Sequence, residues 1–312
     1  MNNTHKAVRI HQFGGPEVLV YEDAPVPSIQ ADEVLVKIHA ASVNPVDWKV
    51  REGYLKDMMP HQLPLVLGWD FAGEIVAVGS GVSDWKIGDA VYARPDIARD
   101  GSYAEHIAVR ASEIAAKPSK ATWQEAAAVP LAALTAWQAL YEIAGLQAGE
   151  SVLIHAGAGG VGSFAIQLAK LRGAHVITTT STKNVALVKA LGADEVIDYT
   201  QQDFSQLRDL DVVFDTLGGE IQDNSWQTLK QGGRLVSIIS GPSEEAAARI
   251  NGKALFCFVQ PSAEQLTSLA KLIDAEQLKI VIDSVFPLTE IIAAHAKSES
   301  GRSVGKIVIQ VS

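Results

Sequence analysis

Cysteine is almost absent from this chain of 312 residues, and basic residues are not in excess. The single cysteine, Cys257, excludes an intramolecular disulfide and any zinc site built from several cysteines. It lies in the apolar run 254–259, so we expect a small buried side chain. The formal net charge of −10 argues against general nucleic-acid binding, which needs a basic surface to displace counterions from phosphate.

Long hydrophobic runs are also missing. No apolar run approaches the roughly 20 residues of a membrane span, so we expect no membrane partner. Residues 1–9 are polar and lack the apolar core of a signal peptide, so we expect a cytoplasmic protein. At roughly 100–200 residues per domain, the length predicts two domains.

The first third of the sequence is typical of β structure. Period-two alternation predicts strands, which cover 6–10, 18–22, 33–40, 71–78, 88–92 and 101–109. Residues 280–312 return to this style, with strands over 280–285 and 306–311 and a helix over 289–300. Short strands separated by many glycines indicate a compact, barrel-like β domain.

The pattern changes at Thr122, which forms a capping box with Glu125 and opens a helix. Strands and helices then alternate. The predicted strands are 151–155, 175–180, 195–199, 211–216, 234–239 and 254–259, and the predicted helices include 161–171 and 183–191. Nearly continuous apolar strands are typical of a parallel sheet covered on both faces, so we expect a doubly wound α/β domain over 123–279. Residues 1–122 and 280–312 then form the β-rich substrate domain.

A glycine-rich loop follows the first of these strands and opens a helix. It reads Gly157-Ala158-Gly159-Gly160-Val161-Gly162, which fits G-x-G-x-x-G in the proper context. Gly157 permits a tight turn, Gly159 lets the backbone approach a pyrophosphate, and Gly162 allows close packing of helix on strand. The helix N-terminus attracts phosphate, so the loop predicts a dinucleotide site; a tight turn without ligand is the alternative.

The end of the second strand indicates which dinucleotide binds. NAD sites usually place an acid about 20 residues after the first glycine, to accept from the ribose 2′-hydroxyl. Residues 178–184 instead read Thr-Thr-Thr-Ser-Thr-Lys-Asn, and no acid occurs until Asp194. Hydroxyls and a lysine suit a 2′-phosphate, so we expect NADP(H) rather than NAD(H). A solvated Lys183 in the first turn of the next helix is the alternative.

Metal-binding and nucleophile motifs are missing. The eight histidines form neither H-x-x-x-H nor H-E-x-x-H, so we expect no metal, although histidines and carboxylates can bind zinc. The nucleophile motif G-x-S-x-G of serine hydrolases does not match Gly160-Val161-Gly162-Ser163.

Further motifs are spread along the whole chain. They are Phe13–Leu19, Ala40–Asp47, Leu67–Gly73, Val78–Val82, Trp85–Val91, Leu134–Ala136, Leu191–Tyr199 and Gly305–Ile309. Together with the glycine loop they resemble the medium-chain dehydrogenase/reductase superfamily, and within it the zinc-independent quinone oxidoreductase branch, whose relatives include alkenal and enone reductases. The resemblance implies a Rossmann domain and a GroES-like β-barrel domain.

The chain departs from the alcohol dehydrogenases of that superfamily at their metal. Those proteins carry a cysteine ligand where this chain has Ala41-Ser42-Val43-Asn44, and Gly-His-Glu where it has Gly68-Trp69-Asp70. Their lobe of four cysteines is also absent. The resemblance and the composition therefore both predict activity without zinc.

The resemblance also implies roles for single residues. Asn44 and Tyr54 are the implied catalytic residues, near the nicotinamide and over the substrate; a Tyr54 that is only a buried or surface side chain is the alternative. The implied cofactor-binding residues are Asn44, Thr135, Gly157, Ala158, Gly159, Gly160, Val161, Gly162, Thr180, Ser181, Lys183, Asn184, Tyr199, Gly218, Ile239, Phe258 and Val259. Members of the branch commonly dimerise by joining sheets, which implies a homodimer through Ala254–Val259.

These observations predict hydride transfer from NADPH to a quinone or to the β-carbon of an α,β-unsaturated carbonyl. The cofactor carries the chemistry, and an electron-poor acceptor needs only a hydrogen-bond donor where negative charge develops. Asn44, Tyr54, a ribose hydroxyl or water can be that donor. The alternatives are an enoyl-thioester reductase and a non-enzymatic NADPH-binding protein with a structural or sensor role.

Overall fold

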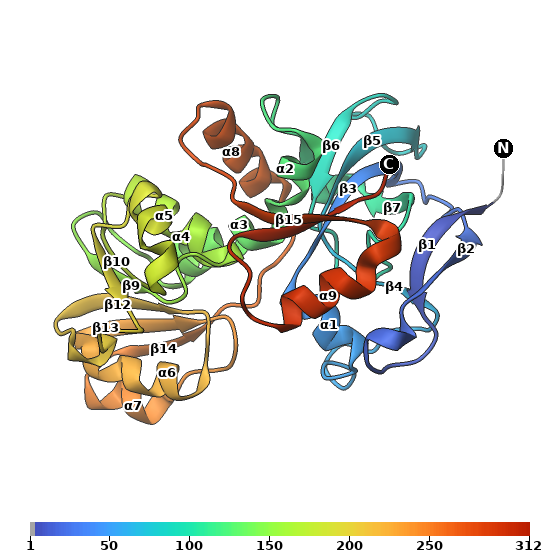
Figure 1. Cartoon of the computed structure of the whole chain (residues 1–312). Coiled ribbons are helices and arrows are strands. Elements are labelled where there is room, and N and C mark those ends of the chain that lie inside the picture. Colours follow the sequence, from blue (N-terminus) through green and yellow to red (C-terminus); the bar gives the residue numbers. More distant parts are fainter. Residues whose placement is uncertain (1–3) are drawn as a thin grey trace. The chain divides into compact units, whose positions relative to one another are not determined.

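The computed structural model describes residues 4–312, which divide into two compact units. One is built from the residues up to Leu131 together with Gln260–Ser312, and the other is Ala132–Val259 (Figure 1). The division at 122/123 and 279/280 stays a prediction from the sequence.

Within the described residues, the first unit contains a seven-stranded and a three-stranded sheet. The large sheet has the order β15-β16-β3-β5-β6-β8, and β7 also pairs with β3. Its strands are β3 (Glu33–Val43), β5 (Phe71–Val78), β6 (Ala90–Ala93), β7 (His106–Arg110), β8 (Ile114–Ala116), β15 (Ile282–Pro287) and β16 (Lys306–Gln310). The small sheet pairs β1 (Thr4–Ile10) with β2 (Val20–Pro25) and β4 (Leu65–Val66). Alternating side chains of β3, among them Val34, Val36 and Ile38, are buried, as the period-two pattern predicts.

Four α-helices lie wholly within the described part of the first unit: α1 (Pro45–Arg51), α2 (Trp123–Ala127), α8 (Ala263–Asp274) and α9 (Ile291–Glu299). The capping box at α2 is confirmed, since the Glu125 N–H donates to the Thr122 hydroxyl at 3.2 Å and the Thr122 N–H donates to the Glu125 carboxylate at 2.8 Å. Sequence patterns did not predict α1, because seven residues are too few for a helical period to show.

The second unit is a six-stranded parallel sheet with the order β11-β10-β9-β12-β13-β14. Its strands are β9 (Ser151–Ile154), β10 (His175–Thr180), β11 (Glu195–Asp198), β12 (Leu210–Asp215), β13 (Leu229–Ser237) and β14 (Lys253–Phe256). If these six strands are numbered 1 to 6 along the chain, their order in the sheet is 3-2-1-4-5-6. This is the order of a Rossmann domain, and it confirms the predicted fold class. Helices α4 (Gly160–Leu171) and α5 (Val185–Ala190) lie on one face of the sheet, and α6 (Gly219–Ser225) and α7 (Glu244–Arg249) on the other (Figure 1). Helix α3 (Pro130–Trp137) begins in the first unit and continues into the second.

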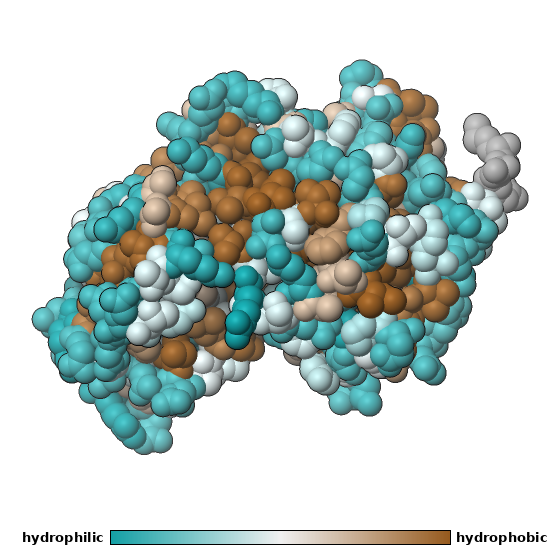
Figure 2. Space-filling model, viewed as in Figure 1, coloured by the Kyte–Doolittle hydropathy of each residue, from teal (hydrophilic) through white to brown (hydrophobic). Residues whose placement is uncertain are grey.

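Two further expectations concern burial and membranes. Cys257 is buried, and burial raises the pKa of its thiol to about 12, so it behaves as the inert small side chain expected. Hydrophilic side chains cover much of the second unit in the view of Figure 2. Among residues 4–312, no helix has both the length and the apolar character to cross a bilayer.

Candidate active site

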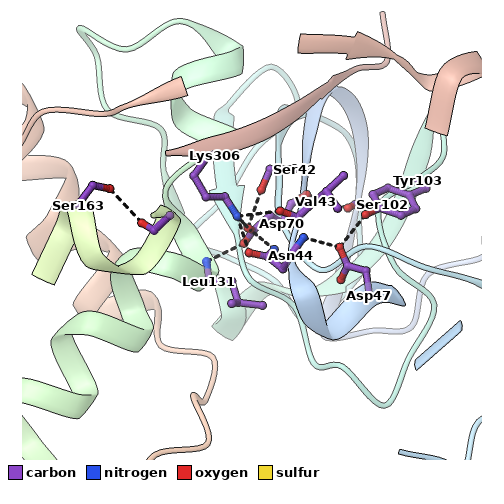
Figure 3. A network of polar contacts seen from close by, with 11 residues as sticks. Ser42, Val43, Asn44, Asp47, Asp70, Ser102, Tyr103, Leu131, Ser163 and Lys306 are labelled. Carbon is purple, nitrogen blue, oxygen red and sulfur yellow. Dashed lines mark hydrogen bonds and ion pairs between the residues drawn. The ribbon is translucent and has the colours of Figure 1, made fainter. Parts of the chain in front are cut away.

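Strand register brings Asn44, Asp70 and Lys306, which are far apart in the sequence, together at one end of β3. β16 runs antiparallel to β3 with Ile307 opposite Val43, so Lys306 lies beside Asn44. β5 pairs on the other side with Phe71 opposite Ala41, so Asp70 lies beside Ser42. We call Ser42, Asn44, Asp47, Asp70 and Lys306 the Asp70 cluster (Figure 3).

The carboxylate of Asp70 is the centre of this cluster. Its Oδ2 accepts hydrogen bonds from Ser42 Oγ at 2.8 Å and from Asn44 Nδ2 at 2.7 Å. The same oxygen lies 3.4 Å from Lys306 Nζ, and Oδ1 accepts from the Leu131 N–H at 2.7 Å. Both oxygens of a fully buried carboxylate are thus bound by donors.

Asp47 holds the backbone of the same asparagine. Its Oδ2 accepts from the Asn44 N–H at 2.8 Å and from the Tyr103 hydroxyl at 2.6 Å. The Tyr103 ring lies against Gly68, where an added Cβ would come within 2.4 Å of ring atom Cε1. Gly68 also has a φ of +86°, so glycine is required there for both reasons.

Burial dominates the electrostatics of the cluster. It raises the pKa of Asp47 to about 7, against the lowering effect of the hydrogen bonds from Tyr103 and Asn44. Burial likewise raises the pKa of Asp70, and the Lys306 ammonium opposes that shift most. It lowers the pKa of Lys306, opposed by Asp70 and Asp47. A second buried cation, Arg94, belongs to the same charge balance, with its pKa lowered by burial.

Tyr54, the second implied catalytic residue, makes no hydrogen bond to Asn44 in the described part of the chain. Its side chain is 69% exposed, and its ring meets the edge of Trp48 with centroids 6.3 Å apart. Within residues 4–312 its hydroxyl has no hydrogen-bond partner. The Lys49 ammonium lies 5.7 Å from the centroid of the same Trp48 ring, and burial lowers the pKa of this lysine.

The glycine loop lies at the carboxyl end of β9, where the sheet has β10 on one side and β12 on the other. In an open α/β sheet this switch point is where ligands bind. A Cβ on Gly157 would lie 2.1 Å from Thr178 Oγ1, and one on Gly162 would lie 2.3 Å from the Ala156 carbonyl oxygen. Both glycines are therefore required by the fold itself. Gly159 meets only the Ala156 oxygen, at 3.2 Å, which leaves its other side open.

The residues implied at the adenosine 2′-phosphate lie together at the ends of β10 and β11. The Tyr199 N–H donates to the Thr180 carbonyl at 3.1 Å, and Asn184 Nδ2 donates to Ser181 Oγ at 3.4 Å. Lys183 is exposed and has no ion-pair partner within the described residues. We call Thr180–Asn184 the nucleotide turn.

Sequence reasoning missed an acid beside this turn. Asp198, the last residue of β11, stands opposite Thr180 in the sheet. Its Oδ2 accepts from Thr182 Oγ1 at 2.6 Å, and its Oδ1 accepts from Thr200 Oγ1 at 2.7 Å. The signal was present in the motif Leu191–Tyr199, but register was needed to show that Asp198 lies next to the turn.

The histidine before the glycine loop has a structural role. His155 is buried, with Nε2 2.9 Å from Ser225 Oγ and Nδ1 3.3 Å from Thr179 Oγ1. Burial lowers its pKa to about 4, so it is neutral near pH 7 and ties β9 to its neighbours.

The remaining implied cofactor residues are placed as follows. Gly218 has a φ of +73°, and an added Cβ would lie 2.8 Å from Ile239 Cγ2, so these two residues are neighbours. Phe258 and Val259 follow β14, and Ile239 and Phe258 are partly exposed. Thr135 lies in α3 and is buried.

Two family models match the chain: "Alcohol dehydrogenase GroES-like domain" over residues 30–134 and "Zinc-binding dehydrogenase" over residues 191–309. A chloroplast envelope quinone oxidoreductase homolog of Arabidopsis thaliana is 36% identical, covering 97% of this chain and 98% of the relative. A 2-methylene-furan-3-one reductase of Solanum lycopersicum is 40% identical over 97% of this chain and 78% of its own. The solved quinone oxidoreductase from Coxiella burnetii is 39% identical, with a TM-score of 0.92 over 99% of this chain and 100% of that one.

The residues present do not fit the zinc ion that the second model's description implies. Within residues 4–312, no three histidine, cysteine or acidic side chains are grouped as metal ligands. In the two segments where the alcohol dehydrogenases carry zinc ligands, this chain has Asn44, Trp69 and Asp70. The Trp69 indole N–H donates to the Arg99 carbonyl at 3.1 Å. An indole N–H has no lone pair for a metal, and the Asp70 carboxylate already faces an ammonium.

Proposed function

Because the chain belongs to the medium-chain dehydrogenase/reductase superfamily, in its quinone oxidoreductase branch, we propose that it transfers hydride from NADPH to quinones or α,β-unsaturated carbonyls, without zinc. Membership itself makes it a nicotinamide-dependent oxidoreductase. The relatives named for a quinone and for a methylene-furanone share an electron-poor acceptor, which supports this substrate class.

The donor side chains of the nucleotide turn are the main support for NADPH as the cofactor. The exposed Lys183 ammonium, the hydroxyl of Ser181 and the amide of Asn184 are donors for a phosphate. Asp198 is the opposing charge, but its oxygens already accept from Thr182 and Thr200. Donors prevail on the exposed side of the turn, which favours a 2′-phosphate over a 2′-hydroxyl.

NADPH supplies the hydride, and the side chains of this protein bind and orient the reactants. In the substrate unit Asn44 is the group we assign to the acceptor. Its amide nitrogen gives one N–H to Asp70 and retains a second. A fixed N–H at the acceptor oxygen stabilises the negative charge that develops during hydride transfer. Asn44 and the indole of Trp69 stand where zinc ligands would be needed, so the proposed reaction requires no metal.

A steady-state acceptor screen tests the activity. The purified protein is assayed with NADPH and with NADH against 1,4-quinones, enones and crotonyl thioesters, after dialysis against a chelator. We expect turnover of quinones or enones with NADPH and no loss after chelation. Preferential turnover of the thioester would make it an enoyl-thioester reductase, and tight NADPH binding without oxidation by any acceptor would make it a non-enzymatic binding protein.

Cofactor choice is tested by Lys183→Ala. Removing the ammonium should raise the KM for NADPH about tenfold, equivalent to about 1.4 kcal/mol, and leave the KM for NADH within about twofold. Lys189→Ala, on the exposed side of α5, is the matched control and should change neither value. Equal effects of Lys183→Ala on both cofactors would contradict the assignment.

The proposal includes a homodimer and a cytoplasmic location. β14 is an edge strand of the six-stranded sheet; Phe256, its last residue, and Phe258, two residues later, are partly exposed. An apolar edge strand favours pairing with a second copy. Sedimentation of Phe256→Lys should then show monomers where the unaltered protein sediments as a dimer.

A further inference from the structure

A buried ammonium is the least expected feature of the substrate unit. Lys306 is 3% exposed, whereas lysines almost never lose contact with water unless paired. Its Nζ lies 3.2 Å from the Val43 carbonyl oxygen and 3.4 Å from Asp70 Oδ2, and it also donates to Asn44 Oδ1. Three N–H bonds meet three acceptors, so the charged form is fully satisfied.

The surroundings of Asp70 favour an ionised carboxylate. The Leu131 N–H, the Asn44 amide nitrogen and the Lys306 ammonium can only donate, and Ser42 places its hydroxyl on the same oxygen as two of them. A protonated carboxyl would have to donate a hydrogen bond, and among these groups only the Ser42 hydroxyl could accept it, by giving up its own donation to Asp70. Asp70 and Lys306 therefore form a buried ion pair, with the charges satisfied by hydrogen bonds.

This ion pair fixes the amide of Asn44. An ammonium has no lone pair, so Lys306 must face the amide oxygen. A carboxylate has no proton, so Asp70 must face the amide nitrogen. The reversed orientation would place nitrogen against ammonium and oxygen against carboxylate. The position of the free N–H of Asn44 is thus set by residues from two other segments of the chain.

We propose that Lys306 is a positioning residue for the reaction: its ammonium keeps Asp70 ionised and locks Asn44 with its free N–H directed at the acceptor oxygen. The inference rests on the proposed function, in which Asn44 binds that oxygen. Lys306 itself touches neither reactant, so its effect passes entirely through Asp70 and Asn44.

Lys306→Met tests this by removing the charge at nearly constant length. Asp70 then takes up a proton, its hydroxyl can donate to the Asn44 oxygen, and the amide is free to reverse. We expect kcat to fall at least about tenfold at pH 7, with the dissociation constant of NADPH within about twofold of the original. Lys37→Met, on the exposed side of β3, is the matched control and should change neither.

The pH dependence separates positioning from simple loss of packing. The charged or titratable groups that face Asp70 are Asp47, Tyr103, Arg94 and Lys306, and only Lys306 differs between the two proteins. In Lys306→Met, kcat should rise as the pH increases and Asp70 loses its proton. The free energy of unfolding should fall as the pH rises from the pKa of an unfolded aspartate, about 3.9, to the raised pKa of Asp70 in the folded variant, because the folded state holds an extra proton in that window; the fall should be steeper than in the unaltered protein. A packing defect would lower both kcat and the free energy of unfolding, but it would not make one rise and the other fall with pH.

The double variant Asp70→Asn with Lys306→Met keeps the test decisive if the single variant does not fold. It removes both charges of the ion pair together, so we expect its stability to lie nearer that of the unaltered protein than the stability of Lys306→Met does. The amide introduced at position 70 can face Asn44 with either of its ends, so kcat should stay low and show no pH dependence from this site. Unchanged kcat in either variant would overturn the inference. Failure of the unaltered protein with every acceptor would instead overturn the proposed function, and the unfolding measurements would still test the ion pair.

Discussion

The Asp70 cluster and the nucleotide turn are both polar, yet they are built in opposite ways. In the cluster, buried groups from β3, α1, β16 and the residues that flank β3 and β5 hydrogen-bond to one another, and the central carboxylate has a donor on each oxygen. In the nucleotide turn, Lys183 and nearby Tyr199 are exposed, and neither side chain has a hydrogen-bond or ion-pair partner within the described residues.

The difference shows how each region can contribute to binding. A ligand at the nucleotide turn supplies partners that the protein leaves open, so substitutions there should change affinity more than stability. In the cluster, Asp70 and Lys306 hold the amide of Asn44 without any ligand, so the position of this one group is set before anything binds. Substitutions in the cluster should change stability and turnover together.

The largest expected effect comes from the glycine loop. Gly162→Val would place a branched side chain where even a Cβ lies 2.3 Å from the Ala156 carbonyl oxygen. The loop must shift and lose its phosphate-binding shape. We expect the dissociation constant of NADPH, measured by fluorescence titration, to rise at least about 100-fold, equivalent to about 2.7 kcal/mol.

Gly241→Val serves as its control, because an added Cβ at Gly241 has no neighbour within 4 Å and its backbone is not left-handed. The control should bind NADPH as the unaltered protein does. If Gly162→Val also kept its affinity for NADPH, the loop would not be the phosphate site. The contrast between a ligand-binding region and a preformed cluster would then not hold.

The second prediction concerns Asp47, on the other side of the comparison, and its effect is on stability rather than on binding. Burial raises its pKa from 3.8 to about 7, so between those values the folded state binds a proton that the unfolded state has released. Stability should therefore be highest at low pH, fall as the pH rises through this window and level off above it. The total loss is at most about 4 kcal/mol at about 1.36 kcal/mol for each pH unit.

Asp47→Asn isolates this contribution, since an amide does not titrate. Denaturant unfolding of both proteins from about pH 4 to about pH 8 should show the stability of the unaltered protein falling relative to that of the variant. Parallel curves would mean that Asp47 stays ionised throughout and that hydrogen bonds from Tyr103 and Asn44 outweigh its burial.

The same contrast explains what could be predicted from the sequence. The glycine loop and the nucleotide turn are short segments, so their residue types and spacing are visible directly, as is the alternation that predicts the Rossmann sheet. The Asp70 cluster is not local: Asn44 is 26 positions from Asp70 and 262 from Lys306. Only the register of β3 against β5 and β16 brings these residues together. Lys306 opens an apolar strand, where a lysine normally indicates nothing more than a solvated strand end.

The smallest expected effect concerns Tyr54, which the resemblance pairs with Asn44 in catalysis. The two differ as the regions do: the Asn44 amide is held by Asp70 and Lys306, whereas the Tyr54 hydroxyl is exposed and unpaired among the residues described. A donor that nothing orients gives little advantage over water. We expect Tyr54→Phe to keep kcat within about twofold and stability within about 0.5 kcal/mol, while Tyr54→Ala, which removes the ring, should raise the KM of the acceptor more than it lowers kcat. A tenfold or larger drop in kcat for Tyr54→Phe, measured with the best acceptor, would show that the hydroxyl becomes ordered only when the reactants are bound, and preorganisation would then not distinguish the catalytic donor.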